Sequence, residues 1–167
     1  MKESSLSVSR QSRYLCRNIW SVHLTVSQTI KTLYKYSVVG HSETQTTQEQ
    51  KLRKSIQCKT QGIEAIVCFV KPEELPMEVA QECLIAWEDP ANISKNGHYN
   101  PKDPQKISQQ ILSLKKRFGM NSRILYGGSV NENNAKPILQ NELISGALIG
   151  NASLNPKNFC EIIKFCL

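Results

Sequence analysis

Four short segments of the chain carry the residue types that proton transfer and anion binding require. Gly40-His41-Ser42-Glu43 and Glu88 supply an imidazole and carboxylates, which can move a proton when they face one pocket. Gly127-Gly128-Ser129 and Gly150-Asn151 supply glycines, whose backbone N–H groups can approach a phosphate closely. Each segment follows a run of strand-forming residues, and parallel α/β folds bind their ligands at such strand ends. The ordered set therefore predicts one site for a phosphorylated ligand and proton transfer.

Each segment taken alone also has a purely structural interpretation. His41 could hydrogen-bond within a turn, and Glu88 could be an ordinary turn carboxylate, since most glutamates are solvated. The pair Gly127-Gly128 is of a kind found in many loops. Only the ordered set of segments favours a functional site over unrelated turns.

Along the chain, β-rich runs alternate with helical patterns, and this order is typical of βαβ units around a parallel sheet. We predict strands at residues 14–16 (weak), 36–39, 63–70, 83–87, 123–126 and 146–149. A complete eight-unit barrel typically needs about 250 residues, more than the 167 present here. The predicted fold class is therefore α/β: an incomplete TIM-type β/α barrel with about six of eight parallel strands, or a short open sheet. We expect a polar tail at residues 1–12 and a single domain at 13–167.

Capping residues and apolar spacing locate the helices between these strands. Asp103 is predicted to cap a helix with Pro104 at its first position, and this helix ends at Gly119. Its apolar face comprises Ile107, Ile111, Leu114 and Phe118. Short helical segments are also expected within 72–81 and at 135–139, and Asn155-Pro156 begins the last helix.

An earlier helix is predicted from a capping box formed by Thr46 and Glu49. Its apolar face is expected to carry Leu52 and Ile56, and Gly62 ends it.

Composition narrows the class of protein further. The first 60 residues contain ten Lys and Arg residues against three acidic ones, and the remaining 107 residues contain eleven of each. This local excess suits an acidic or phosphorylated partner, and nucleic acid is a minority interpretation because aromatic residues do not interleave with the basic ones. No membrane-spanning run or secretory leader is visible, so we expect a cytoplasmic protein. The six cysteines show no Cys-x-x-Cys pair, so reduced thiols are expected rather than disulfides or a zinc site.

The motifs together resemble the triosephosphate isomerase family, in collinear order over roughly residues 14–167. Tyr36-Ser37-Val38-Val39-Gly40-His41-Ser42-Glu43 resembles the family's histidine motif, and Ile85-Ala86-Trp87-Glu88 resembles its glutamate motif. Tyr126-Gly127-Gly128-Ser129-Val130 and the segment from Gly146 to Leu154 resemble the two phosphate-binding segments.

The resemblance implies an isomerase that interconverts dihydroxyacetone phosphate and D-glyceraldehyde 3-phosphate, as in glycolysis and gluconeogenesis, without a metal or other cofactor. In that family a glutamate is the base and a neutral histidine the electrophile, so the resemblance implies these roles for Glu88 and His41. The resemblance further implies phosphate binding by Gly128, Ser129, Gly150 and Asn151. Glu43 would have a supporting role.

Two departures from the family pattern leave alternatives open. No segment corresponds to the family's first two β/α units, the first of which supplies an active-site lysine, and Asp89 separates Glu88 from Pro90. Activity is expected to be impaired, or the chain could be an inactive relic that binds phosphorylated ligands. A basic nucleic-acid-binding α/β protein is the remaining alternative. An open barrel would also need a second copy of the chain or a complementing chain.

Overall fold

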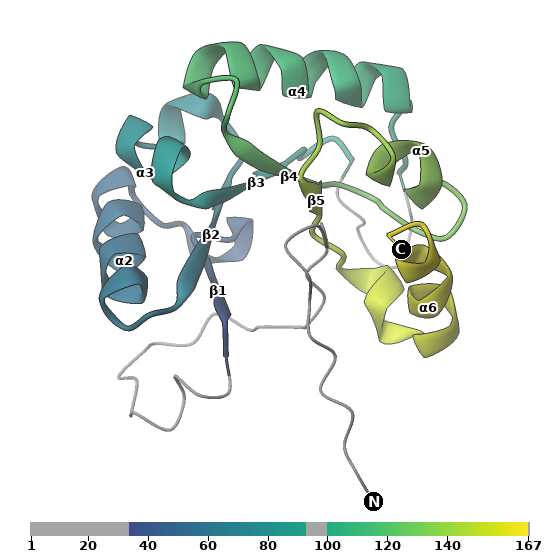
Figure 1. Cartoon of the computed structure of the whole chain (residues 1–167), viewed down its shortest axis with the longest axis horizontal. Coiled ribbons are helices and arrows are strands. Elements are labelled where there is room, and N and C mark those ends of the chain that lie inside the picture. Colours follow the sequence, from purple (N-terminus) through teal and green to yellow (C-terminus); the bar gives the residue numbers. More distant parts are fainter. Residues whose placement is uncertain (1–33, 93–99, 167) are drawn as a thin grey trace, which may run out of the picture.

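A single open sheet forms the centre of the structure, a computed structural model that describes residues 34–92 and 100–166. Its five strands are all parallel and run in sequence order, β1-β2-β3-β4-β5 (Figure 1). They are β1 (Tyr36–Val39), β2 (Glu64–Phe69), β3 (Leu84–Glu88), β4 (Arg123–Gly127) and β5 (Gly146–Ala147). This confirms the predicted class of a partial TIM-type α/β fold.

The helices form an arc along one side of the sheet (Figure 1). The α-helices are α2 (Gln48–Thr60), α3 (Met77–Glu82), α4 (Pro104–Phe118), α5 (Ala135–Leu139) and α6 (Pro156–Lys164). Three short 3-10 helices complete the described part of the chain: η1 (Ser42–Thr44), η2 (Pro72–Glu74) and η3 (Asn151–Leu154). The predicted strand at 14–16 and the predicted tail at 1–12 lie outside the described residues.

Helix α4 confirms the prediction made from its capping and spacing. The Asp103 side chain accepts a hydrogen bond from the amide of Gln105, and Pro104 occupies the first turn. The four predicted apolar residues are all buried, and Gly119 ends the helix at a φ of 112° that favours glycine. Burying each such side chain stabilises the fold by about 1.5–3 kcal/mol. These side chains join the cluster between the sheet and the helices, where the Phe118 ring meets that of Phe69 from β2.

Helix α2 corrects two predictions. Its capping box is formed by Thr47 and Gln50, one residue later than predicted. Its buried residues are Lys51, Ser55 and Cys58, whereas Ile56 is 52% exposed and Leu52 half-buried. Residues 51, 55 and 58 follow the spacing of one helix face, and Ile56 is turned away from it. Apolar residue type therefore did not identify the face that packs on the sheet.

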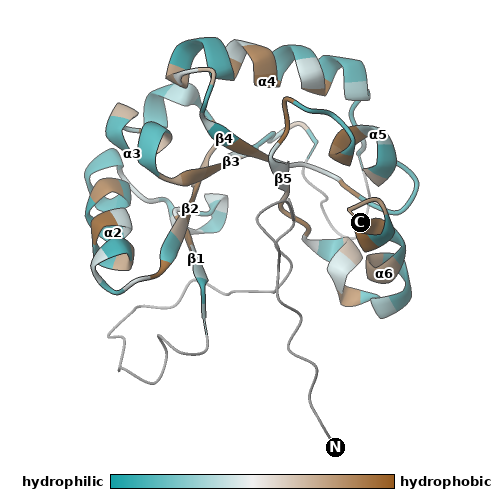
Figure 2. Cartoon of the chain, viewed as in Figure 1, coloured by the Kyte–Doolittle hydropathy of each residue, from teal (hydrophilic) through white to brown (hydrophobic). Residues whose placement is uncertain are grey.

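The two faces of the sheet have separate apolar clusters. Hydrophobic residues colour much of the central strands brown (Figure 2). One cluster packs under the helices and includes Val67, Ile85 and Tyr126. The opposite face, called the inner face here, carries a smaller buried cluster of Ile66, Cys68, Leu84, Ala86 and Leu125. The alternation of side chains along each strand produces this division.

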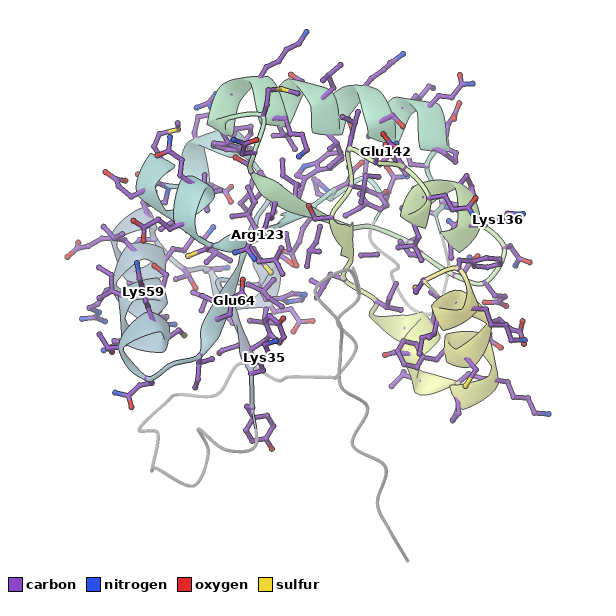
Figure 3. All side chains as sticks on the ribbon, in the orientation of Figure 1. Lys35, Lys59, Glu64, Arg123, Lys136 and Glu142 are labelled. Carbon is purple, nitrogen blue, oxygen red and sulfur yellow. The ribbon has the colours of Figure 1, made fainter. Side chains whose placement is uncertain are left out.

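At the amino ends of the strands, Arg123 Nη1 lies 2.6 Å from Glu64 Oε1, across β3 (Figure 3). Glu64 is two residues from Ile66 and Arg123 two residues from Leu125, so each lies on the same, inner face as its cluster neighbour. The polar residues singled out from the sequence lie instead at the opposite, carboxyl ends.

Strand and helix boundaries differ from the predicted ones by a residue or two. The last strand comprises only Gly146–Ala147, although the Leu148 amide still donates to the Tyr126 carbonyl at 2.9 Å. Cys68 of β2 is fully buried, and Cys58, Cys68 and Cys83 are free thiols. No helix among residues 34–92 and 100–166 has the length and apolar character needed to cross a bilayer.

Candidate active site

The parallel strands bring the four predicted segments to one edge of the sheet. Gly40 and His41 follow β1, and Glu88 is the last residue of β3. Gly128 follows β4, and Gly150 lies three residues beyond β5. Because neighbouring parallel strands end on the same side, the segments occupy one rim, as the sequence predicted.

His41 and Glu88 are in direct contact at this rim. His41 Nε2 lies 2.9 Å from Glu88 Oε1. The backbone amide of Ser42 donates to the other carboxylate oxygen, Glu88 Oε2, at 2.9 Å. The Glu88 side chain is only 3% exposed, whereas that of His41 is 36% exposed. The structure thus brings together the two residues predicted to transfer protons, with one of them open to solvent.

Contact with Glu88 raises the pKa of the His41 imidazole. The hydrogen bond to Glu88 is the largest cause of a raised His41 pKa, partial burial opposes it, and the charges of Glu88 and Glu43 add to it. The free protein therefore favours protonated His41 more than an isolated histidine would. An imidazole donor beside a buried carboxylate can polarise an oxygen while the carboxylate accepts a proton from an adjacent carbon.

Gly127 provides the space that Glu88 occupies. It pairs with Glu88 in the sheet register, and a Cβ at Gly127 would lie 3.1 Å from the Trp87 carbonyl oxygen and 3.4 Å from Glu88 Cγ. Any side chain here would therefore press on the strand end that carries the carboxylate. Gly127 stands beside the residues predicted to bind phosphate, and the structure adds this second reason for a glycine.

Gly128 and Ser129, predicted to bind phosphate, are tightly packed. A Cβ at Gly128 would lie 2.1 Å from Tyr126 Oη. Ser129 is buried, its amide donates to the Asn92 carbonyl at 2.7 Å, and its hydroxyl accepts from the Asn100 amide at 3.1 Å. These bonds tie the β4 loop to both sides of the segment 93–99. Phosphate binding by Ser129 stays a prediction, and it would require some of these bonds to be exchanged.

Gly150 and Asn151 are exposed at the start of η3. The Gly150 carbonyl accepts from the amide of Ser153 at 2.9 Å and from its hydroxyl at 2.7 Å. Their predicted contact with a phosphate stays a prediction. Glu43 is 77% exposed, and its Oε2 lies 3.7 Å from His41 Nδ1. Its supporting role stays a prediction.

Two charged residues near the rim were not predicted. Lys51 is buried under Gly40, where a Cβ would lie 2.8 Å from Lys51 Cε, and its ammonium lies 3.6 Å from Glu74 Oε2. Lys102 forms a 2.6 Å ion pair with the buried Asp89. Neither lysine has a local sequence signal, because only the tertiary fold brings its partner near. Within the described ranges, no cluster of three His, Cys, Asp or Glu side chains could hold a metal ion.

Comparison with known proteins identifies the family of the chain. The family described as triosephosphate isomerase matches residues 23–166. The triosephosphate isomerase of Legionella pneumophila (strain Lens) is 40% identical over 88 residues, which cover 50% of this chain and 35% of that protein. The triosephosphate isomerase of Aquifex aeolicus (strain VF5) is 29% identical over 157 residues, which cover 77% of this chain and 64% of that protein. The aligned part of the chain thus spans between about one third and two thirds of the length of these relatives. Because the family match extends over far more than half of its residues, the chain belongs to the triosephosphate isomerase family.

Proposed function

We propose that the protein interconverts dihydroxyacetone phosphate and D-glyceraldehyde 3-phosphate by proton transfer through Glu88 and His41. The observation that carries this proposal is the 2.9 Å contact between His41 Nε2 and Glu88 Oε1 at the carboxyl ends of parallel strands. Family membership supports the substrate class, since curated relatives bear the name triosephosphate isomerase.

The proposed reaction begins with substrate entering between the two side chains. A Glu88 carboxylate oxygen takes the proton from the carbon beside the carbonyl. The electron pair of that C–H bond forms the double bond of an enediolate, and the carbonyl π pair moves to oxygen. His41 Nε2 donates a hydrogen bond to that oxygen, where the negative charge develops. The hydroxyl proton on the carbon that lost its C–H proton passes to the other oxygen by way of His41 Nε2. Glu88 then returns a proton, its own or one exchanged with solvent, to the neighbouring carbon, so that the carbonyl forms at the first carbon and the isomer results.

Burial of Glu88 suits the role of base. Its side chain is almost fully enclosed, and a poorly solvated carboxylate has few water molecules to shed before it accepts a proton from carbon. The Ser42 amide holds Oε2, which leaves Oε1 as the oxygen that exchanges His41 for substrate. A solvent-exposed carboxylate that samples several rotamers would lack this fixed orientation.

An assay of purified protein in both directions tests the proposal. Glu88→Gln keeps the size of the side chain and removes the base, so we expect the rate to fall by at least about 100-fold. The matched control is Glu82→Gln, which alters an exposed glutamate paired with Lys59 near the amino end of β3, away from the carboxyl ends that carry the site. Equal rates in the parent and in Glu88→Gln would show that the activity comes from a host contaminant and would overturn the proposal.

A further inference from the structure

Lys102 contacts the residues on both sides of Glu88. Its ammonium lies 2.6 Å from Asp89 Oδ2 and 5.2 Å from the centre of the Trp87 ring. A third contact, 2.5 Å to Gln110 Oε1, joins it to α4. The Lys102 side chain is 16% exposed and that of Asp89 only 6% exposed. This is a largely enclosed ion pair, unlike the surface pair of Lys59 and Glu82.

The contacts lie on the opposite side of the strand from the carboxylate. Trp87 belongs to the cluster under the helices, whereas Glu88 is two residues from Ala86 and so shares its inner face. Lys102, which covers the Trp87 ring, therefore contacts the end of β3 on the face that packs under the helices. Glu88 is free to point toward His41, while its two chain neighbours are fixed.

The surroundings of this ion pair are rigid. The Trp87 ring packs on the Tyr126 ring at 5.7 Å between centroids, and Tyr126 is fully buried. Lys102 lies directly before the N-cap of α4, whose apolar face is buried, so its backbone is fixed by that helix. A cation anchored to a buried helix can transmit this rigidity to β3. Displacement of a reacting group by about 1 Å can cost a factor of about 100 in rate.

We propose that Lys102 is a positioning residue for Glu88, holding Trp87 and Asp89 so that the carboxylate meets His41. Its role in catalysis rests on the proposed function, but its effect on the geometry of Glu88 does not. Asp89, which separates Glu88 from Pro90, is thereby the anchor through which Lys102 acts.

The pKa of His41 reports the position of Glu88 without any turnover. It is measured from the pH dependence of the imidazole C–H resonances, and His41→Asn identifies which resonance belongs to His41. In Lys102→Met we expect the pKa to fall toward the ordinary value of 6.5, because the raising contact with Glu88 is weakened. Removing a positive charge would by itself raise the pKa of the imidazole. A fall therefore identifies movement of Glu88 and not a change in the local field.

Two further variants make this result specific. Lys102→Arg keeps a cation able to reach Asp89 and Trp87, so it should preserve the parent pKa of His41. Lys59→Met, which removes an exposed ammonium from α2 (Figure 3), should also leave that pKa unchanged. A folded Lys102→Met protein with the parent pKa of His41 would overturn the proposal.

If Lys102→Met does not fold, Lys102→Gln is judged by the same criterion, since its shorter, uncharged side chain also removes the cation from Asp89 and Trp87. Unfolding of both variants would also overturn the proposal, because Lys102 would then be a general determinant of stability. Where the parent isomerises, kcat in Lys102→Met should fall by about 10- to 100-fold with KM within about twofold. A parent with no activity contradicts the proposed function, while the His41 titration still decides the role of Lys102.

Discussion

Glu88 Oε1 accepts a hydrogen bond from His41 Nε2, 2.9 Å away, and this contact is the main cause of the raised His41 pKa. The contact joins the end of β3 to the turn after β1, although β2 lies between these strands in the sheet. The free protein therefore holds its proposed base and electrophile against each other. Substrate must separate the two groups to enter between them.

This contact predicts a pH dependence of stability. The pKa of His41 is raised in the folded state, so its contribution to stability is fully present below the unfolded pKa of about 6.5 and is lost as pH rises through the folded value. We expect the free energy of unfolding lost in His41→Asn to be larger at about pH 5.5 than at about pH 8.5. Urea unfolding of both proteins at the two pH values measures this. An equal difference at both would show that the contact does not favour protonated His41.

The close approach of Gly128 to Tyr126 predicts a costly substitution. A Cβ at Gly128 would overlap the Tyr126 hydroxyl at 2.1 Å, so we expect Gly128→Ala to destabilise the fold by about 1–3 kcal/mol. Urea unfolding checks the value. The cost should be smaller when measured in a Tyr126→Phe background, which removes the closest atom. An equal cost in both backgrounds would indicate strain elsewhere in the loop.

The buried hydroxyl of Tyr126 predicts a substitution that does not lower stability. It is buried without a hydrogen-bond partner among the described residues, and burial raises the pKa of the phenol. An unsatisfied buried polar group costs about 1–3 kcal/mol. Tyr126→Phe should therefore be as stable as the parent or more stable in thermal unfolding. A clear loss of stability would mean that the hydroxyl is bonded in solution.

The two partners of the ion pair between Lys51 and Glu74 differ in burial, so removing one charge should cost more stability than removing the other. Lys51 is 3% exposed and Glu74 is 41% exposed. Glu74→Gln leaves a buried ammonium without its counter-charge and should cost about 1–3 kcal/mol. Lys51→Met leaves only a solvated carboxylate and should change stability by less than about 1 kcal/mol. Chemical unfolding of the two variants tests the order, and the reverse order would contradict it.

The sequence predicted the strands, the order of the site segments and helix α4 because these depend on local signals. Strand propensity, a capping Asp103 with Pro104, and regular apolar spacing each act over a few residues. Since parallel strands end on one side, His41 and Glu88 could be expected at one rim before their distance was known.

The remaining features depend on contacts between distant segments. Lys51 is a charged residue on the buried face of α2, so an apolar pattern selected Ile56 in its place. Likewise, Lys102 becomes informative only when Asp89 and Trp87 are brought to it by folding. The tie between Ser129 and Asn100 is equally invisible in the sequence.

Isomerisation in deuterated water tests the central claim most directly, because proton transfer to a carboxylate exposes the proton to solvent. We predict that the product formed from D-glyceraldehyde 3-phosphate by the parent carries solvent deuterium on the carbon that received the proton, and that Glu88→Gln forms no such product above background. Product without deuterium would indicate a direct hydride shift, and deuterated product at an equal rate from Glu88→Gln would exclude Glu88 as the base. Either result would contradict the proposed roles of Glu88 and His41.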